Sequence, residues 1–186
     1  MLIKEAQSEV RRIYLGGLVG QSVSGFLWLA SAALGTWHSA RSAIILLVVG
    51  GFLIYPATSA TLRCSGRPAS VSHANPFRWL ALQAAFVLPV SMLLVVPVAM
   101  YRLNLFFPAM AVLLGAHYLP FATLYGMRSF LVLAFALVAS GVAIALRLPG
   151  SFALAGWIVG ILLLVFAVVG YMEQGLSAQQ RGQQNA

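Results

Sequence analysis

Acidic side chains are scarce in this chain. Aspartate is absent from its 186 residues, and glutamate occurs only at Glu5, Glu9 and Glu173, all outside the long apolar runs. Proton-coupled transporters and membrane hydrolases usually carry a carboxylate within the membrane. Since no carboxylate is present there, the sequence argues against both of these classes.

Metal-ligand clusters and catalytic motifs are also missing. Cys64 is the only cysteine, so the chain cannot form an internal disulfide. His117 has no second histidine, cysteine or carboxylate at a spacing that suits a metal site. There is no Gly-x-Ser-x-Gly elbow, phosphate-binding loop, His-Glu-x-x-His motif or paired carboxylate. We therefore expect no catalytic residues, no metal ion, no cofactor and no enzymatic activity.

The composition is that of a membrane protein. Hydrophobic residues make up 61% and charged residues 8% of the chain, and its mean hydropathy is +0.94. Soluble domains are about 45–50% apolar and about a quarter charged. The net charge of +8 comes from basic residues scattered singly between apolar runs, not gathered on one polar face with stacking aromatics. We therefore expect the lipid bilayer as a partner and no nucleic acid.

Six apolar runs are each long enough to cross a bilayer as a helix. They cover residues 13–35, 42–62, 79–100, 105–125, 129–146 and 152–172. The sequence thus predicts an all-α, polytopic integral membrane protein whose single six-helix transmembrane domain covers residues 13–172. Residues 1–12 have the pattern of an amphipathic helix lying at the membrane interface. Residues 173–186 are polar and rich in glutamine, which is typical of a disordered tail.

Basic residues also predict the orientation, because lysine and arginine accumulate on the cytoplasmic side. With six spans, both termini share one side of the membrane with the second and fourth loops. That side holds Lys4, Arg11, Arg12, Arg63, Arg67, Arg78, Arg128 and Arg181. The other side holds Arg41, Arg102 and Arg147. Eight against three places both termini in the cytoplasm.

Polar residues and helix-breaking prolines recur in the cytoplasmic half of the first four spans. At the α-helical rise, Gln21 and His117 each lie ~12 Å along their spans from that side. Pro56, Pro89 and Pro120 each leave a carbonyl without its helical donor. If these groups face one another, they form a polar pocket that opens to the cytoplasm. The candidate pocket residues are His117, Tyr118, Pro120, Gln21, Ser24, Thr58 and Gln83.

An alternative interpretation needs no ligand. Each polar group could find one local partner and only strengthen helix packing, at ~0.6 kcal/mol per hydrogen bond on average. His117 would then be a structural histidine. The sequence leaves both interpretations open.

The first span is rich in small residues. Gly16, Gly20 and Ser24 follow one another at intervals of four, and Gly25 belongs to the adjacent stripe. Small residues let helix backbones approach closely in membranes. We expect Gly16, Gly20 and Gly25 to serve helix packing, either within the chain or between copies of it.

Three segments resemble those of an uncharacterised family of small bacterial six-span membrane proteins, classed as a domain of unknown function. They are YLGGLVGQSVSG (14–25), GAHYLPF (115–121) with YGMR (125–128), and PGSFALAG (149–156). The resemblance covers about residues 5–172. It implies a multi-pass protein of the bacterial inner membrane, and it carries no activity or site residues.

Two functional hypotheses follow. In the first, the chain is a non-enzymatic protein that binds or transports an unidentified small solute through the cytoplasm-facing pocket. In the second, it is a structural or interaction protein that forms homo-oligomers through the glycine-rich first helix.

Overall fold

The computed structural model describes residues 2–148 and 150–184, with side chains described up to residue 176. Over these residues the chain is helical and contains no strand. Its elements are α1 (Ile3–Tyr14), η1 (Leu15–Gly17), α2 (Leu18–Trp37), α3 (Ala40–Cys64), α4 (Arg78–Met92), α5 (Val95–Tyr101), η2 (Leu103–Leu105), α6 (Phe106–Tyr125), α7 (Ser129–Arg147) and α8 (Leu154–Gln184).

Six helical stretches of the described chain are long and apolar enough to cross a membrane. The first includes α1, η1 and α2, the third joins α4 to α5, and the fourth joins η2 to α6. Each of the other three corresponds to one long helix. This confirms the predicted all-α architecture with six helices of transmembrane length.

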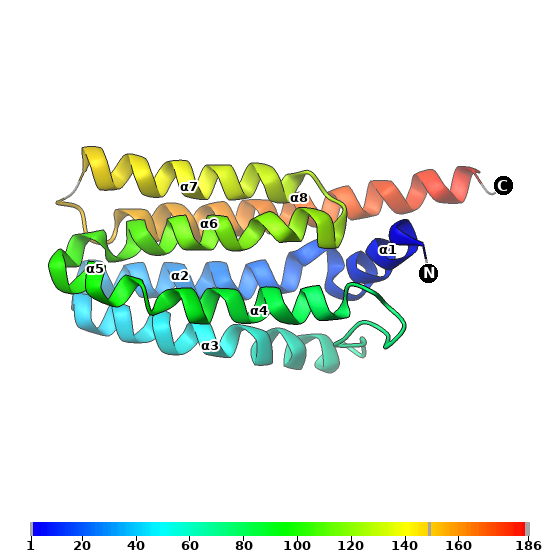
Figure 1. Cartoon of the computed structure of the whole chain (residues 1–186), viewed down its shortest axis with the longest axis horizontal. Coiled ribbons are helices and arrows are strands. Elements are labelled where there is room, and N and C mark those ends of the chain that lie inside the picture. Colours follow the sequence, from blue (N-terminus) through cyan, green and yellow to red (C-terminus); the bar gives the residue numbers. More distant parts are fainter. Residues whose placement is uncertain (1, 149, 185–186) are drawn as a thin grey trace.

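The six spans run side by side along the longest axis of the molecule (Figure 1). Helix α2 packs extensively on α3 and α8, and α6 packs on α7 and α4, so α2 and α6 are the central helices. Figure 1 also shows both chain ends at the same end of the bundle, together with α1 and the α3–α4 loop. We call this the terminal end.

Helix α1 is separated from α2 by a sharp turn. Leu15, Gly16 and Gly17 have φ values of 52°, 64° and 94°, in the region that favours glycine. The turn lets α1 fold against the protein, where Ala6, Val10 and Ile13 are buried. The predicted amphipathic segment thus places much of its apolar face on the protein itself.

Two polar contacts attach α1 to the end of α6. Gln7 Nε2 donates to the carbonyl of Thr123 at 2.8 Å, and Arg11 Nη1 donates to the carbonyl of Tyr125. The last carbonyls of a helix have no intrahelical donor, so side chains of α1 satisfy two groups that the fold would otherwise leave open.

The third span is interrupted between α4 and α5. Pro97 has no N–H to donate to the carbonyl of Leu93, and α4 ends one residue earlier, at Met92. Pro56, Pro89 and Pro120 have a weaker effect, because α3, α4 and α6 continue through them.

The structure of the polar C-terminal segment differs from the predicted one. Disorder was predicted for residues 173–186, whereas α8 continues as a helix to Gln184. Glutamine, glutamate, alanine and arginine are good helix formers, and extending an existing helix avoids the cost of nucleation. Residues 185 and 186 of the predicted tail lie outside the described residues.

An aromatic cluster fills the core away from the terminal end. The ring of Phe107 lies 5.9 Å from Trp28, 5.3 Å from Phe106 and 5.1 Å from Phe152, measured between centroids. Phe107 itself is fully buried. Open space within the bundle is therefore expected nearer the terminal end.

Candidate ligand-binding cavity

A cavity of about 380 Å³ lies between α2, α3, α4 and α6. Tyr14 of α1, Gly17 of η1, Phe130 of α7 and the α3–α4 loop complete its wall. Its lining begins at Arg78, the first residue of α4, and extends to Leu88 and Leu114. Ten residues of α4 separate Arg78 from Leu88, which is ~15 Å at the α-helical rise. The cavity thus reaches from the terminal end to about the middle of a bilayer whose hydrocarbon core is ~30 Å thick.

Five of the seven predicted pocket residues line this cavity. Gln21 and Ser24 come from α2, Thr58 from α3, and His117 and Tyr118 from α6. The exposed fractions of Gln21, Ser24 and Thr58 are 4%, 4% and 9%. Side chains far apart in the sequence therefore form one polar group inside the bundle.

Three buried polar atoms of this group have no hydrogen-bond partner. They are Gln21 Oε1, Thr58 Oγ1 and His117 Nδ1. Among the described side chains, the other such atoms are Ser129 Oγ and Gln174 Oε1, which belong to residues outside the cavity lining. Buried polar groups in proteins are nearly always paired with protein or water. None of these three atoms has the local protein partner that the alternative interpretation would require.

One wall of the cavity is aromatic. The ring of Phe121 lies 5.0 Å from His117 and 5.9 Å from Tyr125, and the latter pair is stacked at an interplanar angle of 11°. Tyr125 in turn lies 4.7 Å from Phe130. His117, Phe121 and Tyr125 occupy one face of α6 because they follow one another at intervals of four residues.

The cavity has a polar mouth at the terminal end. Ser70, Val71 and His73 of the α3–α4 loop line it together with Arg78. Arg78 Nη1 lies 2.9 Å from His73 Nδ1. We define Arg78 and His73 as the mouth pair.

Residues of α1 hold the loop beside this mouth. Glu9 accepts hydrogen bonds from the Ser72 backbone N–H at 2.7 Å and from Asn75 Nδ2 at 2.8 Å. Asn75 Nδ2 also donates to the carbonyl of Ala6 at 3.1 Å, and Asn75 is buried. The amphipathic helix thus positions the loop that carries His73.

Two predicted pocket residues do not line the cavity. Gln83 is exposed, because Leu82 and Ala85 on either side of it occupy the cavity face of α4. Pro120 is partly buried and likewise lies off the cavity face of α6, next to Phe121. A prediction based on depth alone cannot distinguish the faces of a helix.

The predicted depth of Gln21 also needs correction. Counting from residue 13 predicts ~12 Å, whereas α2 begins at Leu18 and leaves Gln21 only ~5 Å from the helix start. Gln21 therefore lies in the first turn of α2, close to the mouth.

The glycines of the first span are divided between two roles. A Cβ added to Gly25 would lie 2.9 Å from Leu164 Cγ, and Gly16 lies directly against the backbone of Gly170, so both glycines pack on α8. A Cβ on Gly20 would meet only Thr58, at 3.8 Å, inside the cavity. These contacts lie within the chain, and the homo-oligomer stays a prediction.

Some lining residues were missed by reasoning from the sequence. Arg78 was counted only as a topology signal, although its position at the end of the longest loop marked it as a candidate. Tyr14, Phe130 and Leu114 line the cavity through contacts between distant segments. No local pattern in the sequence could reveal those contacts.

The bundle of long apolar helices defines this chain as an α-helical, multi-pass membrane protein. It belongs to a family of unknown function, DUF7010, which matches residues 3–173. This agrees with the resemblance seen in the sequence. Neither the curated proteins nor the solved structures contain a match to the chain.

Proposed function

We propose that this chain is a non-enzymatic membrane protein that binds a small molecule in the cavity at its terminal end. The observation that carries the proposal is the presence of three unpartnered buried polar atoms on residues that line one cavity. A buried polar group without a hydrogen-bond partner destabilises a protein by about 1–3 kcal/mol. A ligand that donates and accepts hydrogen bonds would remove this penalty. The size also fits, since ligand cavities are typically ~300–1,000 Å³.

Several features support binding in preference to catalysis or transport. Among the described residues, His117 has no carboxylate beside it in the cavity wall to assist general acid–base chemistry. The cluster of Trp28, Phe106 and Phe107 closes the bundle beyond the cavity. Transport would require a second conformation that opens this cluster.

The location is also part of the proposal. The distribution of lysine and arginine favours a cytoplasmic position for both termini, so that the mouth of the cavity faces the cytoplasm. The resemblance to small bacterial six-span proteins favours the bacterial inner membrane as the location.

The test uses the full-length chain, extracted from its membrane and analysed by native mass spectrometry. We expect a bound small molecule on the wild type. Gly20→Leu fills the cavity from α2, and Thr58→Val removes one unpartnered hydroxyl without a change in size, so both variants should lose the adduct. Ala30→Leu introduces the same leucine side chain at an exposed position of α2 and should keep the adduct. An adduct that persists in both cavity variants, or that is absent from the wild type, would contradict the proposal.

A further inference from the structure

The cavity is open sideways as well as at its mouth. Tyr55 of α3 and Leu82 of α4 both line the cavity, yet their exposed fractions are 55% and 43%. Tyr55 precedes the last residue of α3, Cys64, by nine positions, or ~14 Å. Helices α3 and α4 lie next to each other on one side of the bundle (Figure 1). An opening at the depth of Tyr55 faces the hydrocarbon region of a bilayer, not water.

The polarity of the lining changes with depth. The mouth carries Arg78 and His73, and the neutral polar group of Gln21, Thr58 and His117 follows within ~12 Å of the terminal end. Beyond ~14 Å, the depth of Tyr55, the wall is apolar. The lining residues deeper than this are Gly51, Ile54, Leu88, Pro89 and Leu114.

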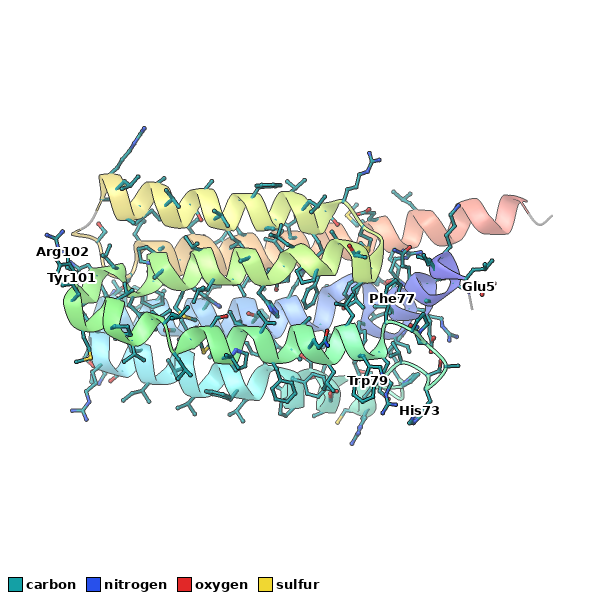
Figure 2. The ribbon with its side chains drawn as sticks, in the orientation of Figure 1. Glu5, His73, Phe77, Trp79, Tyr101 and Arg102 are labelled. Atoms are coloured by element: carbon teal, nitrogen blue, oxygen red, sulfur yellow. The ribbon has the colours of Figure 1, made fainter. Side chains whose placement is uncertain are left out.

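The mouth pair lies where lipid head groups would be. Arg78 Cζ lies 5.5 Å from the ring centroid of Trp79, which is 65% exposed. Tryptophans at the ends of spans mark the membrane–water interface. Figure 2 shows Trp79 and His73 close to the α3–α4 loop at the terminal end. Arg78 therefore lies at the level of the phosphate groups of one leaflet.

Among the described residues that line the mouth, charge is of one sign; the Glu9 carboxylate holds Ser72 of the α3–α4 loop but is not part of the lining. The lining contains the guanidinium of Arg78 and, among the described residues, no carboxylate. Arginine binds phosphate oxygens with two parallel hydrogen bonds, which makes it well suited to an anionic head group.

Together these features match the order of groups in one leaflet of a bilayer. From the terminal end inward, the polar side chains of the wall are first cationic and then neutral and hydrogen-bonding, and the deepest part of the wall is apolar. A phospholipid presents a phosphate, then glycerol and ester oxygens, then an acyl chain in the same order. We propose that the cavity binds a lipid or lipid-like amphiphile with an anionic phosphate head, which enters between α3 and α4 from the leaflet at the terminal end.

The assignment rests on the proposed function and adds a ligand class to it. The phosphate pairs with Arg78, and hydroxyl or ester groups of the ligand satisfy Gln21, Thr58 and His117. The apolar end lies between Leu88 and Leu114. A single chain with its glycerol region suits a cavity of this volume, and any further chain would stay in the bilayer.

The experiment measures binding by native mass spectrometry to the full-length, delipidated chain in neutral detergent. The probes are dioleoyl phosphatidylglycerol, dioleoyl phosphatidylcholine, glycerol 3-phosphate and inorganic phosphate. The wild type should bind phosphatidylglycerol about tenfold more tightly than phosphatidylcholine, and it should bind the two soluble anions at least a hundredfold more weakly. Arg78→Gln should abolish the preference for phosphatidylglycerol. Arg67→Gln removes the same charge from an exposed position of the adjoining α3–α4 loop, outside the lining, and should retain the preference.

Three results would overturn the lipid assignment. Equal binding of the two lipids by the wild type would exclude an anionic head group as the recognised feature. Soluble anions that bind as tightly as phosphatidylglycerol would show that the site takes free phosphate. Phosphatidylglycerol binding that survives Gly20→Leu would place the lipid outside the cavity.

These failures are distinguishable from failure of the proposed function. If neither lipid probe binds, but the wild type carries a co-purified adduct that Gly20→Leu loses, the cavity binds a ligand of another class. If neither the adduct nor the lipids respond to Gly20→Leu, both proposals are wrong.

Discussion

Glu9 of α1 receives two hydrogen bonds from Ser72 of the α3–α4 loop, one from the backbone N–H at 2.7 Å and one from the hydroxyl at 3.2 Å. The two residues are 63 positions apart in the chain. Their contact joins the amphipathic segment to the loop that forms the mouth of the cavity. One of the three carboxylates in the protein is thus used to position this loop.

Glu9→Gln should destabilise the protein and loosen the loop. A charged acceptor of three hydrogen bonds, from Ser72 and Asn75, becomes a weaker neutral one, and we expect a loss of ~1 kcal/mol. Thermal unfolding in detergent measures this effect. Glu5→Gln serves as the control, because Glu5 is exposed and accepts a local hydrogen bond from the N–H of Leu2, the N-cap of α1. Equal unfolding temperatures for wild type and Glu9→Gln would show that the contact contributes nothing.

Arg11→Met should release α1 from the end of α6. The substitution keeps the apolar stem and leaves the Tyr125 carbonyl without the guanidinium donor, at a cost of ~2 kcal/mol. Limited proteolysis should then cleave within residues 3–14 faster than in the wild type. Arg12→Met alters the neighbouring, exposed arginine and should leave the cleavage rate unchanged. Identical digestion patterns for Arg11→Met and Arg12→Met would show that the contact between Arg11 and Tyr125 does not hold α1 in place.

Alanine at two glycines of α2 should have opposite effects. A Cβ at Gly25 approaches Leu164 Cγ to 2.9 Å and Gly160 O to 3.2 Å, so Gly25→Ala should cost ~1–3 kcal/mol through overpacking against α8. Gly20→Ala finds ordinary contact with Thr58 and should be neutral or stabilising by up to ~1 kcal/mol. The melting temperatures of the two purified variants test this difference. If Gly20→Ala is as harmful as Gly25→Ala, Gly20 does not face open space.

His117→Phe should leave the ligand-free protein nearly as stable as the wild type. His117 Nδ1 has no hydrogen-bond partner in the described structure, and phenylalanine preserves the ring contact with Phe121. The same variant should lose the small-molecule adduct described above. Unfolding temperatures of the delipidated proteins separate stability from binding. A large fall in stability would assign His117 a structural role instead.

The single cysteine reports the orientation of the chain. Cys64 is exposed and ends α3 at the terminal end. A membrane-impermeant maleimide should therefore miss Cys64 in intact cells and label it in inverted vesicles. His38→Cys in a Cys64→Ser background places an exposed thiol in the α2–α3 loop at the opposite end and should show the reverse pattern. Labelling of Cys64 in intact cells would show that the orientation of the chain is opposite to the predicted one.

The amino-acid sequence by itself determined the number, position and helical character of the spans. Apolar stretches such as residues 42–62 and 129–146 predicted α3 and α7 to within a few residues. The reason is physical, because a segment in lipid must satisfy its backbone hydrogen bonds internally and therefore forms a helix wherever the apolar run is long enough. The amphipathic pattern of residues 1–12 likewise indicated α1.

Only the tertiary structure decided which face of each helix turns inward. Thr58 and His117 meet in one cavity while Gln83, at a suitable depth, is exposed, and Gly25 packs on α8 while Gly20 does not. The rotation of a helix about its axis depends on its packing partners, and hydropathy is almost insensitive to it. The bond between Glu9 and Ser72 is a contact of the same kind, because it exists only after the turn at Gly16 has folded α1 back onto the loop.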